Sequence, residues 1–427
     1  MIERIKDIWL SLEGIFYYFF FLKRSSFWSP KKIEQYQYGK LKKMLLVCET
    51  KVPYYQRLFN EIGFEVERDF KSINDLKKIP ITTKDNIRKH YVEFLNPDYA
   101  GKSIELKTSG STGEPLKVQI SKNQWVVEQG IVWRHWKWNG YHFRKKMGII
   151  RSYTPKNEKL IKYDKIRNFI YYSPYHLTDE NMNMYLDHMI KEKVEFLRGY
   201  PSSLEALALY VLKSHHSIPR IKGILSASEV LTGRTRNTIE KAFNCKVTNW
   251  YGLAECIVTM GDCEKHEGLH VFEEYGYAEF LNTSDQGQKR IIGTNLHNYA
   301  MPLLRYETND IAEIENECSC ARNSRVVKNI IGRNNSFIKL KDRNIPITNF
   351  YTLMEHYLQV ESWQIVQHGE KCIELILGKR VDKGLRDELI NEYRLRLPDW
   401  VDFNISFDKE FIKKGEGKKV AFVRVDE

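Results

Sequence analysis

The sequence TSGSTGEP at residues 108–115 stands between two β-like runs, SIELK (103–107) and LKVQIS (116–121). Glycines let a phosphate approach the backbone closely, and the amides and hydroxyls of such a loop can donate hydrogen bonds to phosphate oxygens. The loop is not of the Walker A type, because no GK[ST] follows and the next segment is expected to be a strand. The unbroken run of Ser, Thr and Gly favours a phosphate-binding loop over the alternative, an ordinary polar hairpin turn.

Strand-like and helical segments alternate on the C-terminal side of this loop. Strands are expected at 145–153, 193–200, 221–230 and 245–255, and helices at 124–138, 181–193, 202–215 and 235–243. Such alternation is typical of α/β layers with mostly parallel strands, so an α/β fold is predicted. Residues 269–315 are expected to be all-β, and 31–100 mainly helical.

The pattern changes near Arg333. A hairpin is expected at 362–379, a helix at 385–397 and a final strand at 401–408, which together make a compact α+β module. The predicted parts are an aromatic amphipathic helix at 1–30, a large domain at 31–333 and a small C-terminal domain at 334–427.

The composition favours a globular protein rich in apolar side chains. Of 427 residues, 42% are hydrophobic and 29% charged, with a net charge of +12. The basic residues are spread among acidic ones, so no nucleic-acid partner is expected, and an enzyme that handles anions fits better. The seven cysteines are odd in number and sparse, which favours reduced cytoplasmic thiols or a metal site.

The segment IWLSLEGIFYYFFFL (residues 8–22) precedes Lys23 and Arg24. It contains Glu13 and is shorter than the roughly 20 apolar residues that a spanning helix needs. No signal-peptidase site follows it. Two interpretations remain open: a helix that lies in a membrane interface from the cytoplasmic side, or a helix docked on the protein's own core or on a partner chain.

Four further motifs follow in order along the chain. In YGLAE (251–255), the Tyr251 ring could stack on a purine and Glu255 could ligate Mg²⁺ near phosphates. In RYETND (305–310), Asp310 could accept hydrogen bonds from ribose hydroxyls, and the alternative is a surface turn that closes a hairpin. Gly332-Arg333 stands before the change of pattern, and GEGK (415–418) is a loop that carries Lys418. Taken alone, Lys418 is typical of a solvated loop residue.

Taken in order, these motifs resemble the adenylate-forming superfamily of acyl-CoA synthetases, luciferases and peptide synthetases. Within it, the chain resembles the phenylacetate–CoA ligase branch, and above all the CapK-like proteins of capsular polysaccharide. Four segments resemble the sequences of that branch: RGYPSSLEALALYV (198–211), ILSASEVLTGRTR (224–236), NYAMPLLRYETNDIAEI (298–314) and CSCARNSRVVKNIIGR (318–333). The resemblance runs from about residue 40 to the C-terminus.

The resemblance implies a large multi-layer α/β adenylation domain followed by a small mobile α+β domain. It implies an ATP-dependent ligase in which a small carboxylic acid attacks the α-phosphate to give an acyl-adenylate and pyrophosphate. A thiol or an amine then takes the acyl group. CoA is one acceptor; an amine or hydroxyl of a polysaccharide precursor is the other.

The resemblance also implies roles for single residues. The phosphates would be held by Thr108, Ser109, Gly110, Ser111, Thr112 and Gly113, and the adenine by Tyr251 and Gly252. Glu255 would bind Mg²⁺, Asp310 the ribose, and Arg333 the ribose or a phosphate. Lys418 would neutralise the charge that develops as the carboxylate meets the α-phosphate, because two anions must approach each other. The catalytic residues are then expected to be Lys418, Glu255 and Thr112.

Three features depart from the family's pattern. Asn335 and Ser336 stand where the family has an acidic pair after Gly-Arg-x, Asp342 where it has a glycine in the next loop, and Ala321 where it has a glycine after Cys-x-Cys. These departures bear on hinge timing and on access of CoA rather than on adenylation.

The cysteines suggest a second kind of site. Cys318 and Cys320 form a Cys-x-Cys pair, and Cys263 is followed by His266 and His270. Three thiolates and one imidazole would satisfy a tetrahedral, structural Zn²⁺ ion; the alternative is a set of unliganded cysteines on a β-layer. Related sequences carry a similar set, and its Gly-Leu-His position favours His270 over His266. Cys256 is expected to serve packing rather than nucleophilic attack.

The acid-binding pocket is proposed from family analogy alone. Its candidates are Trp133, Tyr153, Tyr200 and Ser226–Glu229, of which Trp133 is expected to be a core residue. A different class of function is a catalytically silent, zinc-stabilised protein of glycan assembly. The intact set Glu255, Asp310, Arg333 and Lys418 argues against it.

Overall fold

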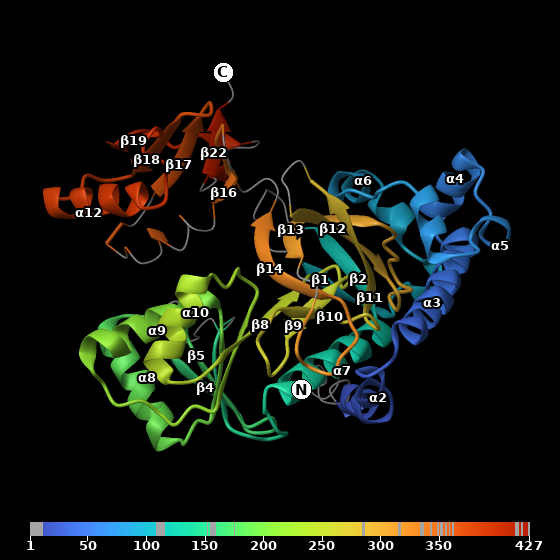
Figure 1. Cartoon of the computed structure of the whole chain (residues 1–427), viewed down its shortest axis with the longest axis horizontal. Helices are drawn as coiled ribbons and strands as arrows, with labels where there is room; N and C mark the ends of the chain where they lie inside the picture. The colour runs from blue at the N-terminus through green and yellow to red at the C-terminus, as the bar shows by residue number, and fades with distance from the viewer. Residues whose placement is uncertain are drawn as a thin grey trace. The chain divides into compact units, whose positions relative to one another are not determined.

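The computed structural model describes residues 12–107, 116–151, 153, 159–174, 176–283, 287–314, 317–333, 337–341, 344–347, 350, 353–354, 357, 359–360, 363–414, 418–419 and 422–425. These residues belong to two compact units, a large one that reaches Ile330 and a small one that begins at Ile331 (Figure 1).

The N-terminal part of the large unit is helical. Its elements are η1 (Tyr18–Leu22), α2 (Lys23–Ser25), α3 (Pro30–Lys51), α4 (Pro53–Ile62), α5 (Val66–Asp69), η2 (Ile73–Lys78), α6 (Lys84–Lys89), η3 (Tyr91–Phe94) and η4 (Pro97–Tyr99). The side chain of Ser29 caps the start of α3, and Gly63 adopts a left-handed conformation with φ of 65° at the end of α4. Thr83 and Asn86 form a capping box that starts α6.

The main sheet of the large unit runs in the order β11-β12-β13-β14-β10-β9-β8-β7-β6-β3-β5-β4. Its strands are β3 (Met147–Ile150), β4 (Ile161–Asp164), β5 (Phe169–Tyr172), β6 (Phe196–Gly199), β7 (Gly223–Ala227), β8 (Val247–Gly252), β9 (Thr259–Asp262), β10 (Leu269–Val271), β11 (Gly276–Asn282), β12 (Gln288–Asn295), β13 (Tyr306–Ile314) and β14 (Val326–Arg333). Strands β5, β3, β6, β7 and β8 are parallel neighbours, and β8 pairs antiparallel with β9. Strand β8 therefore joins a parallel half of the sheet to an antiparallel half.

Helices cover both faces of the parallel half (Figure 1). They are α7 (Lys122–Trp138), α8 (Asp179–Lys191), α9 (Pro201–Ser214) and α10 (Gly233–Phe243). Side chains that alternate along a strand enter different clusters: Ile150 and Ile224 pack with the cluster that contains α8, α9 and α10, whereas Ile149 and Leu225 pack with Trp136 of α7. The α/β fold predicted from the alternating pattern is confirmed, and the helix expected at 124–138 is confirmed as α7.

A separate hairpin precedes α7. Strand β1 (Ser103–Lys107) pairs antiparallel with β2 (Lys117–Ser121), as expected for the two β-like runs. The intervening loop of residues 108–115 lies outside the described residues. The sequence reading missed β4 and β5, which are short and lie on either side of a turn.

The segment of residues 12–28 packs against α7 on one side and exposes aromatic rings on the other. Gly14 and Gly130 permit a close helix crossing, because a Cβ at Gly14 would lie 2.5 Å from the Cβ of Gln129. Leu22 is fully buried, while Phe16, Phe19 and Phe20 are 61%, 58% and 75% exposed. One side of the segment is therefore docked on the protein's own core, and the exposed rings leave the membrane interpretation as a prediction. No helix in the described ranges is long and apolar enough to cross a bilayer.

The small unit is built around a sheet in the order β19-β18-β17-β22. Its elements are β15 (Phe337–Lys339), β16 (Asn344–Pro346), β17 (Trp363–His368), β18 (Cys372–Leu377), α12 (Lys383–Arg394), β19 (Asp402–Phe407), β20 (Lys413–Lys414), β21 (Lys418–Lys419) and β22 (Phe422–Val425). Helix α12 packs Tyr393 against Phe403 with ring centroids 4.4 Å apart. The hairpin, the helix and the strand expected here are confirmed, but that strand is not the final one: β22 follows it and pairs in parallel with β17, a contact between distant segments that local pattern does not encode.

A buried ion pair joins three segments of the large unit. The guanidinium of Arg305 donates to both carboxylate oxygens of Glu279 on β11, at 3.0 and 2.9 Å, and to the carbonyl oxygen of Ile79 at 2.7 Å. The backbone amide of Arg305 donates to the hydroxyl of Thr294 on β12 at 2.9 Å. Arg305 comes directly before β13, so this pair fixes where that strand begins.

Replacing Arg305 by methionine is expected to lower the free energy of unfolding by about 3–5 kcal/mol, because Glu279 would be left as an uncompensated buried charge. Urea unfolding followed by tryptophan fluorescence measures the change. The matched control is Arg290→Met, whose pair with Glu307 is more exposed and should cost at most about 1 kcal/mol. Equal losses in the two variants would contradict the role assigned to Arg305.

Candidate active site

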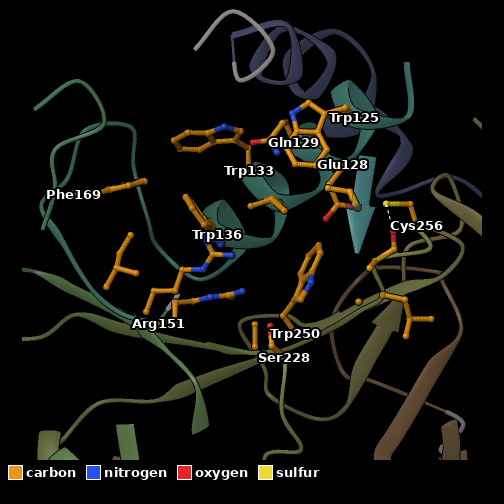
Figure 2. A pocket seen from close by; sticks show the side chains of 18 of the residues that line it. Trp125, Glu128, Gln129, Trp133, Trp136, Arg151, Phe169, Ser228, Trp250 and Cys256 are labelled. Carbon is orange, nitrogen blue, oxygen red and sulfur yellow. Dashed lines mark hydrogen bonds between the residues drawn. The ribbon is translucent and has the colours of Figure 1, made fainter. Parts of the chain in front are cut away.

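A cavity of about 510 Å³ lies at the carboxyl ends of the parallel strands (Figure 2). Helix α7, the strand ends and the segment after β8 form its walls, which comprise Leu106, Trp125, Glu128, Gln129, Val132, Trp133, Trp136, Ile149, Arg151, Arg167, Phe169, Tyr171, Arg198, Ala227, Ser228, Trp250, Gly252, Leu253, Ala254 and Cys256. In open α/β sheets, ligands bind at this edge of the strands, particularly where the strand order changes direction.

The end of β8 and the start of β13 exchange two side-chain hydrogen bonds. The hydroxyl of Tyr251 donates to Oδ2 of Asp310 at 2.8 Å, and the hydroxyl of Tyr306 donates to Oε1 of Glu255 at 2.9 Å. The structure therefore brings together three residues that the sequence pointed to separately: Tyr251, Glu255 and Asp310. Tyr306 is a fourth member that the sequence reading did not single out.

The local fold after β8 depends on small and turn-forming residues. A Cβ at Gly252 would lie 2.7 Å from Nε1 of Trp250, so a larger residue would displace that ring. Cys256 has a φ of 52°, and its carbonyl oxygen accepts a hydrogen bond from the Asn295 amide at 2.8 Å. The hydroxyl of Thr259 donates to the carbonyl oxygen of Tyr251 at 2.7 Å. These contacts hold the YGLAE segment at the cavity edge.

The electrostatics of this group follow from burial. Burial, and after it the charge of Asp310, raises the pKa of Tyr251 well above its ordinary value, so its hydroxyl remains a donor. Glu255 and Asp310 are both buried. Burial also raises the pKa of the Cys256 thiol. A protonated buried thiol is a poor nucleophile, in keeping with a packing role for Cys256.

Several expected site residues lie outside the described part of the chain. They are the loop residues Thr108, Ser109, Gly110, Ser111, Thr112 and Gly113, together with Asn335, Ser336 and Asp342. Arg333 ends β14 and Lys418 begins β21, and for both the backbone alone is described.

The candidates for the acid pocket are distributed differently from the sequence expectation. Trp133, expected in the core, is half-buried and lines the cavity (Figure 2). Its ring packs against the buried rings of Trp136 and Tyr141, with centroids 5.3 and 5.8 Å away, so one side meets the core and the other the cavity. Ala227 and Ser228 also line the cavity, but Tyr200 instead lies with its ring 5.3 Å from the guanidinium carbon of Arg151. Tyr153 is not among the described residues that form the cavity wall.

Cys263, His270, Cys318 and Cys320 converge within the large unit. One ligand atom from each of these residues lies within 4.8 Å of all the others. The sulfurs of Cys263 and Cys318 are 3.6 Å apart, and Nε2 of His270 is 3.4 Å from the sulfur of Cys320. The other ring nitrogen of His270 contacts the hydroxyl of Ser324 at 2.9 Å. His266 lies instead beside Asp262, 3.6 Å from its carboxylate.

The chain matches no family model but has clear relatives. It is 27% identical over 361 residues to the protein CapK of Staphylococcus aureus, which covers 80% of this chain and 78% of CapK. It is 26% identical over 364 residues to the phenylacetate–coenzyme A ligase of Thermus thermophilus, over 81% of this chain and 80% of that enzyme. The chain is a homologue of CapK and of phenylacetate–coenzyme A ligases.

The fold is that of the adenylate-forming ligases. A 2-hydroxyisobutyryl-CoA ligase, solved in the postadenylation state in complex with 2-HIB-AMP, superposes with a TM-score of 0.69 at 15% identity. The match covers 94% of this chain and 92% of that structure. The family resemblance and fold class predicted from the ordered motifs are thus confirmed.

Most residues of the cavity wall were not predicted from the sequence. They include Glu128, Arg151, Arg167 and Arg198, which are single charged residues on an aromatic helix or near strand ends. A partial signal exists for two of them, because Arg151 and Arg198 stand at the carboxyl end of an apolar run in KKMGIIRSY and EFLRGY, whereas Arg167 precedes its run in IRNFIYY. Carboxyl ends of parallel strands meet at one edge of a sheet, but which strands are neighbours is set by the sheet order, so the pairing of Arg151 with Arg198 could not be predicted from the sequence.

Proposed function

We propose that this chain is an ATP-dependent, carboxylate-activating ligase that forms an acyl-adenylate and passes the acyl group to an acceptor. The observation that carries the proposal is the joined group of Tyr251, Asp310, Glu255 and Tyr306 beside a cavity large enough for a small acid. Homology to acid–CoA ligases supports it.

Each member of the group suits one part of the nucleotide. The Tyr251 ring offers an aromatic face for adenine, and its hydroxyl holds Asp310 in place for the ribose hydroxyls. Tyr306 donates to one oxygen of Glu255, and within the described residues no hydrogen bond reaches the second oxygen. A buried carboxylate with one oxygen to spare fits a ligand of Mg²⁺, which would neutralise phosphate charge.

The remaining roles are proposed from motif position. The loop of Thr108–Gly113 would hold the phosphates, Arg333 the ribose or a phosphate, and Lys418 the developing charge. In the first step an oxygen of the substrate carboxylate bonds to the α-phosphorus while the bond to pyrophosphate breaks. For the second step, CoA is one acceptor and a hydroxyl or amine of a polysaccharide precursor the other; formation of a thioester when CoA is added distinguishes them.

We also propose that Cys263, His270, Cys318 and Cys320 bind a structural zinc ion. A tetrahedral ion with Zn–S bonds of about 2.3 Å separates two sulfur ligands by about 3.8 Å, close to the 3.6 Å between Cys263 and Cys318. The contact of His270 with Ser324 would orient the imidazole, as partners of metal-bound histidines do. With four protein ligands the site has no open position, so its role is to hold β9, β10 and the Cys-x-Cys loop together.

A third proposal concerns the N-terminal segment. Phe16, Phe19 and Phe20 are exposed, and the basic residues Lys23 and Arg24 are exposed nearby. Apolar rings beside cations match an anionic membrane surface, where rings enter the headgroup region and cations meet lipid charge. We propose a peripheral contact of this segment with the inner face of the membrane.

The adenylation proposal predicts acid-dependent pyrophosphate release from ATP. A panel of aromatic acids, short fatty acids and amino acids is tested with wild type and with Lys418→Ala. The variant is expected to lose at least about 10²-fold in rate, the size seen when one charge-stabilising group is removed. Its matched control is Lys419→Ala, the neighbour in β21, which should retain wild-type release.

Two results would contradict this assignment. Release that survives Lys418→Ala would mean that the catalytic lysine lies elsewhere. A protein that binds ATP yet releases no pyrophosphate with any acid would favour the silent assembly protein.

The zinc proposal predicts about one zinc ion per chain in protein purified without chelator, measured by elemental analysis. Cys318→Ser should lose the metal and unfold at a lower temperature, because the ion holds segments that are distant in sequence. Cys256→Ser, a buried cysteine outside the cluster, should keep the metal. Equal zinc content in wild type and Cys318→Ser would overturn the ligand set.

The membrane proposal predicts co-flotation with vesicles that contain phosphatidylserine, with binding that weakens as salt rises. The triple variant Phe16→Ser, Phe19→Ser, Phe20→Ser should remain unbound. Phe143→Ser removes an equally exposed ring elsewhere on the large unit and should bind like wild type. Equal binding by the triple variant would exclude this segment as the contact, and a change in its oligomeric state would point to a protein partner instead.

A further inference from the structure

Arginines from three neighbouring strands line the cavity. Arg198 lies in β6, Arg151 directly follows β3, and Arg167 comes just before β5. The sheet order β6-β3-β5 places these strands side by side. Arg151 and Arg198 therefore come from the carboxyl-terminal parts of adjacent strands, whereas Arg167 lines the cavity from the amino end of β5.

The described residues leave this positive charge largely uncompensated. Within them, no carboxylate comes within ion-pair distance of Arg151 or Arg198, whereas Arg167 has Asp164 at 3.8 Å. Glu229 is bound by the backbone amide and hydroxyl of Ser202, both at 3.0 Å, and reaches Arg151 only by longer-range attraction.

Glu128 is the one carboxylate among the described lining residues, and it is already engaged. It accepts a hydrogen bond from the hydroxyl of Tyr275, and its pKa is raised by burial, although the charge of Arg198 opposes this rise. Glu128 thus offsets part of the charge of Arg198 without forming an ion pair with it. Burial lowers the pKa of Arg198, and the charge of Arg151 lowers it further, yet a guanidinium remains protonated at neutral pH. Two adjacent cations in an enclosed space are costly unless an anion joins them.

The rest of the wall is aromatic. Trp125, Trp133, Trp136 and Trp250 line the cavity together with Phe169 and Tyr171. The guanidinium carbon of Arg198 lies 4.9 Å from the Trp136 ring centroid, which holds the cation at the wall. The cavity thus combines flat apolar surfaces with a localised positive end.

We propose that the acid substrate has a planar apolar body and a second anionic group, and that Arg198 and Arg151 bind this second group. The proposal rests on the carboxylate-activating function above, because it names the acid. The carboxylate to be activated would face the wall formed by Gly252, Leu253, Ala254 and Cys256, beside Glu255. Figure 2 shows Arg151 and Cys256 on opposite sides of the cavity, so the two acidic ends would have separate places.

The experiment compares acids that differ in the distal group alone. Phenylacetate, 4-hydroxyphenylacetate, 4-carboxyphenylacetate and 4-sulfophenylacetate are tested for kcat/KM in acid-dependent pyrophosphate release. Binding of each acid is measured separately by quenching of tryptophan fluorescence, since four tryptophans line the cavity. The carboxylate and sulfonate compounds distinguish the two anion chemistries.

Wild type is expected to prefer a dianionic acid over the monoanionic analogues, whose distal group carries no charge, by at least about tenfold in kcat/KM. Arg198→Gln should reduce that selectivity ratio by about 10- to 100-fold, the size of charge-assisted hydrogen bonds. Arg198→Lys should recover part of the ratio, because it restores the charge but not the planar fork. Arg151→Gln gives a second, independent variant, and the exposed Arg220→Gln is the matched control with an unchanged ratio.

The outcomes separate this inference from the function on which it rests. Turnover of the monoanionic acids without preference for a dianion would overturn the inference but would leave the proposed ligase function standing. An equal fall for all acids in Arg198→Gln would also overturn it, since the arginine would then serve the reacting carboxylate or a phosphate. If no acid supports pyrophosphate release, dianion-selective quenching that Arg198→Gln abolishes would still support the inference.

Discussion

The large unit depends on the buried contact between Arg305 and Glu279. This one guanidinium satisfies a carboxylate on β11 and the carbonyl of Ile79, while the backbone of the same residue bonds to β12. Its position fixes the start of β13, and that strand carries Tyr306 and Asp310 to the end of β8. The geometry proposed for nucleotide binding thus depends on an ion pair that is not itself part of the proposed nucleotide site.

Strand β8 is the second constraint, because it belongs to both halves of the sheet. Its parallel neighbour is β7, and through β7 the carboxyl ends of β6 and β3 reach the same edge. Its antiparallel neighbour is β9, and β13, which lies farther along the sheet, is linked to β8 by the hydrogen bond from Tyr251 to Asp310. The polar groups that suit a nucleotide come from the antiparallel side, whereas the arginines and most aromatic rings of the cavity come from the parallel strands and α7. One junction in the sheet therefore places the two proposed reactants next to each other.

The sequence predicted what local patterns and ordered motifs encode. The helix around Trp133, the strands ending at Gly199 and Gly252 and the fold class all follow from periodicity or from motif order. The meeting of Tyr306 with Glu255 and the gathering of Arg151 with Arg198 could not be read, because these contacts depend on sheet order rather than on sequence spacing. For the same reason Trp133 was assigned to the core: periodicity identifies an aromatic helix but not which rings face a cavity.

Helix α7 contacts the N-terminal segment on one side and lines the cavity on the other. Gly14 packs against Gln129, and Gln129 also lines the cavity, so one residue separates the N-terminal segment from the space where the acid would bind. If a bound ligand shifts α7, the contact between Gln129 and Gly14 must shift with it. Linkage then works in both directions: a ligand whose fit depends on this wall changes the docking free energy of residues 12–22, and whatever holds that segment changes the ligand's affinity by the same factor.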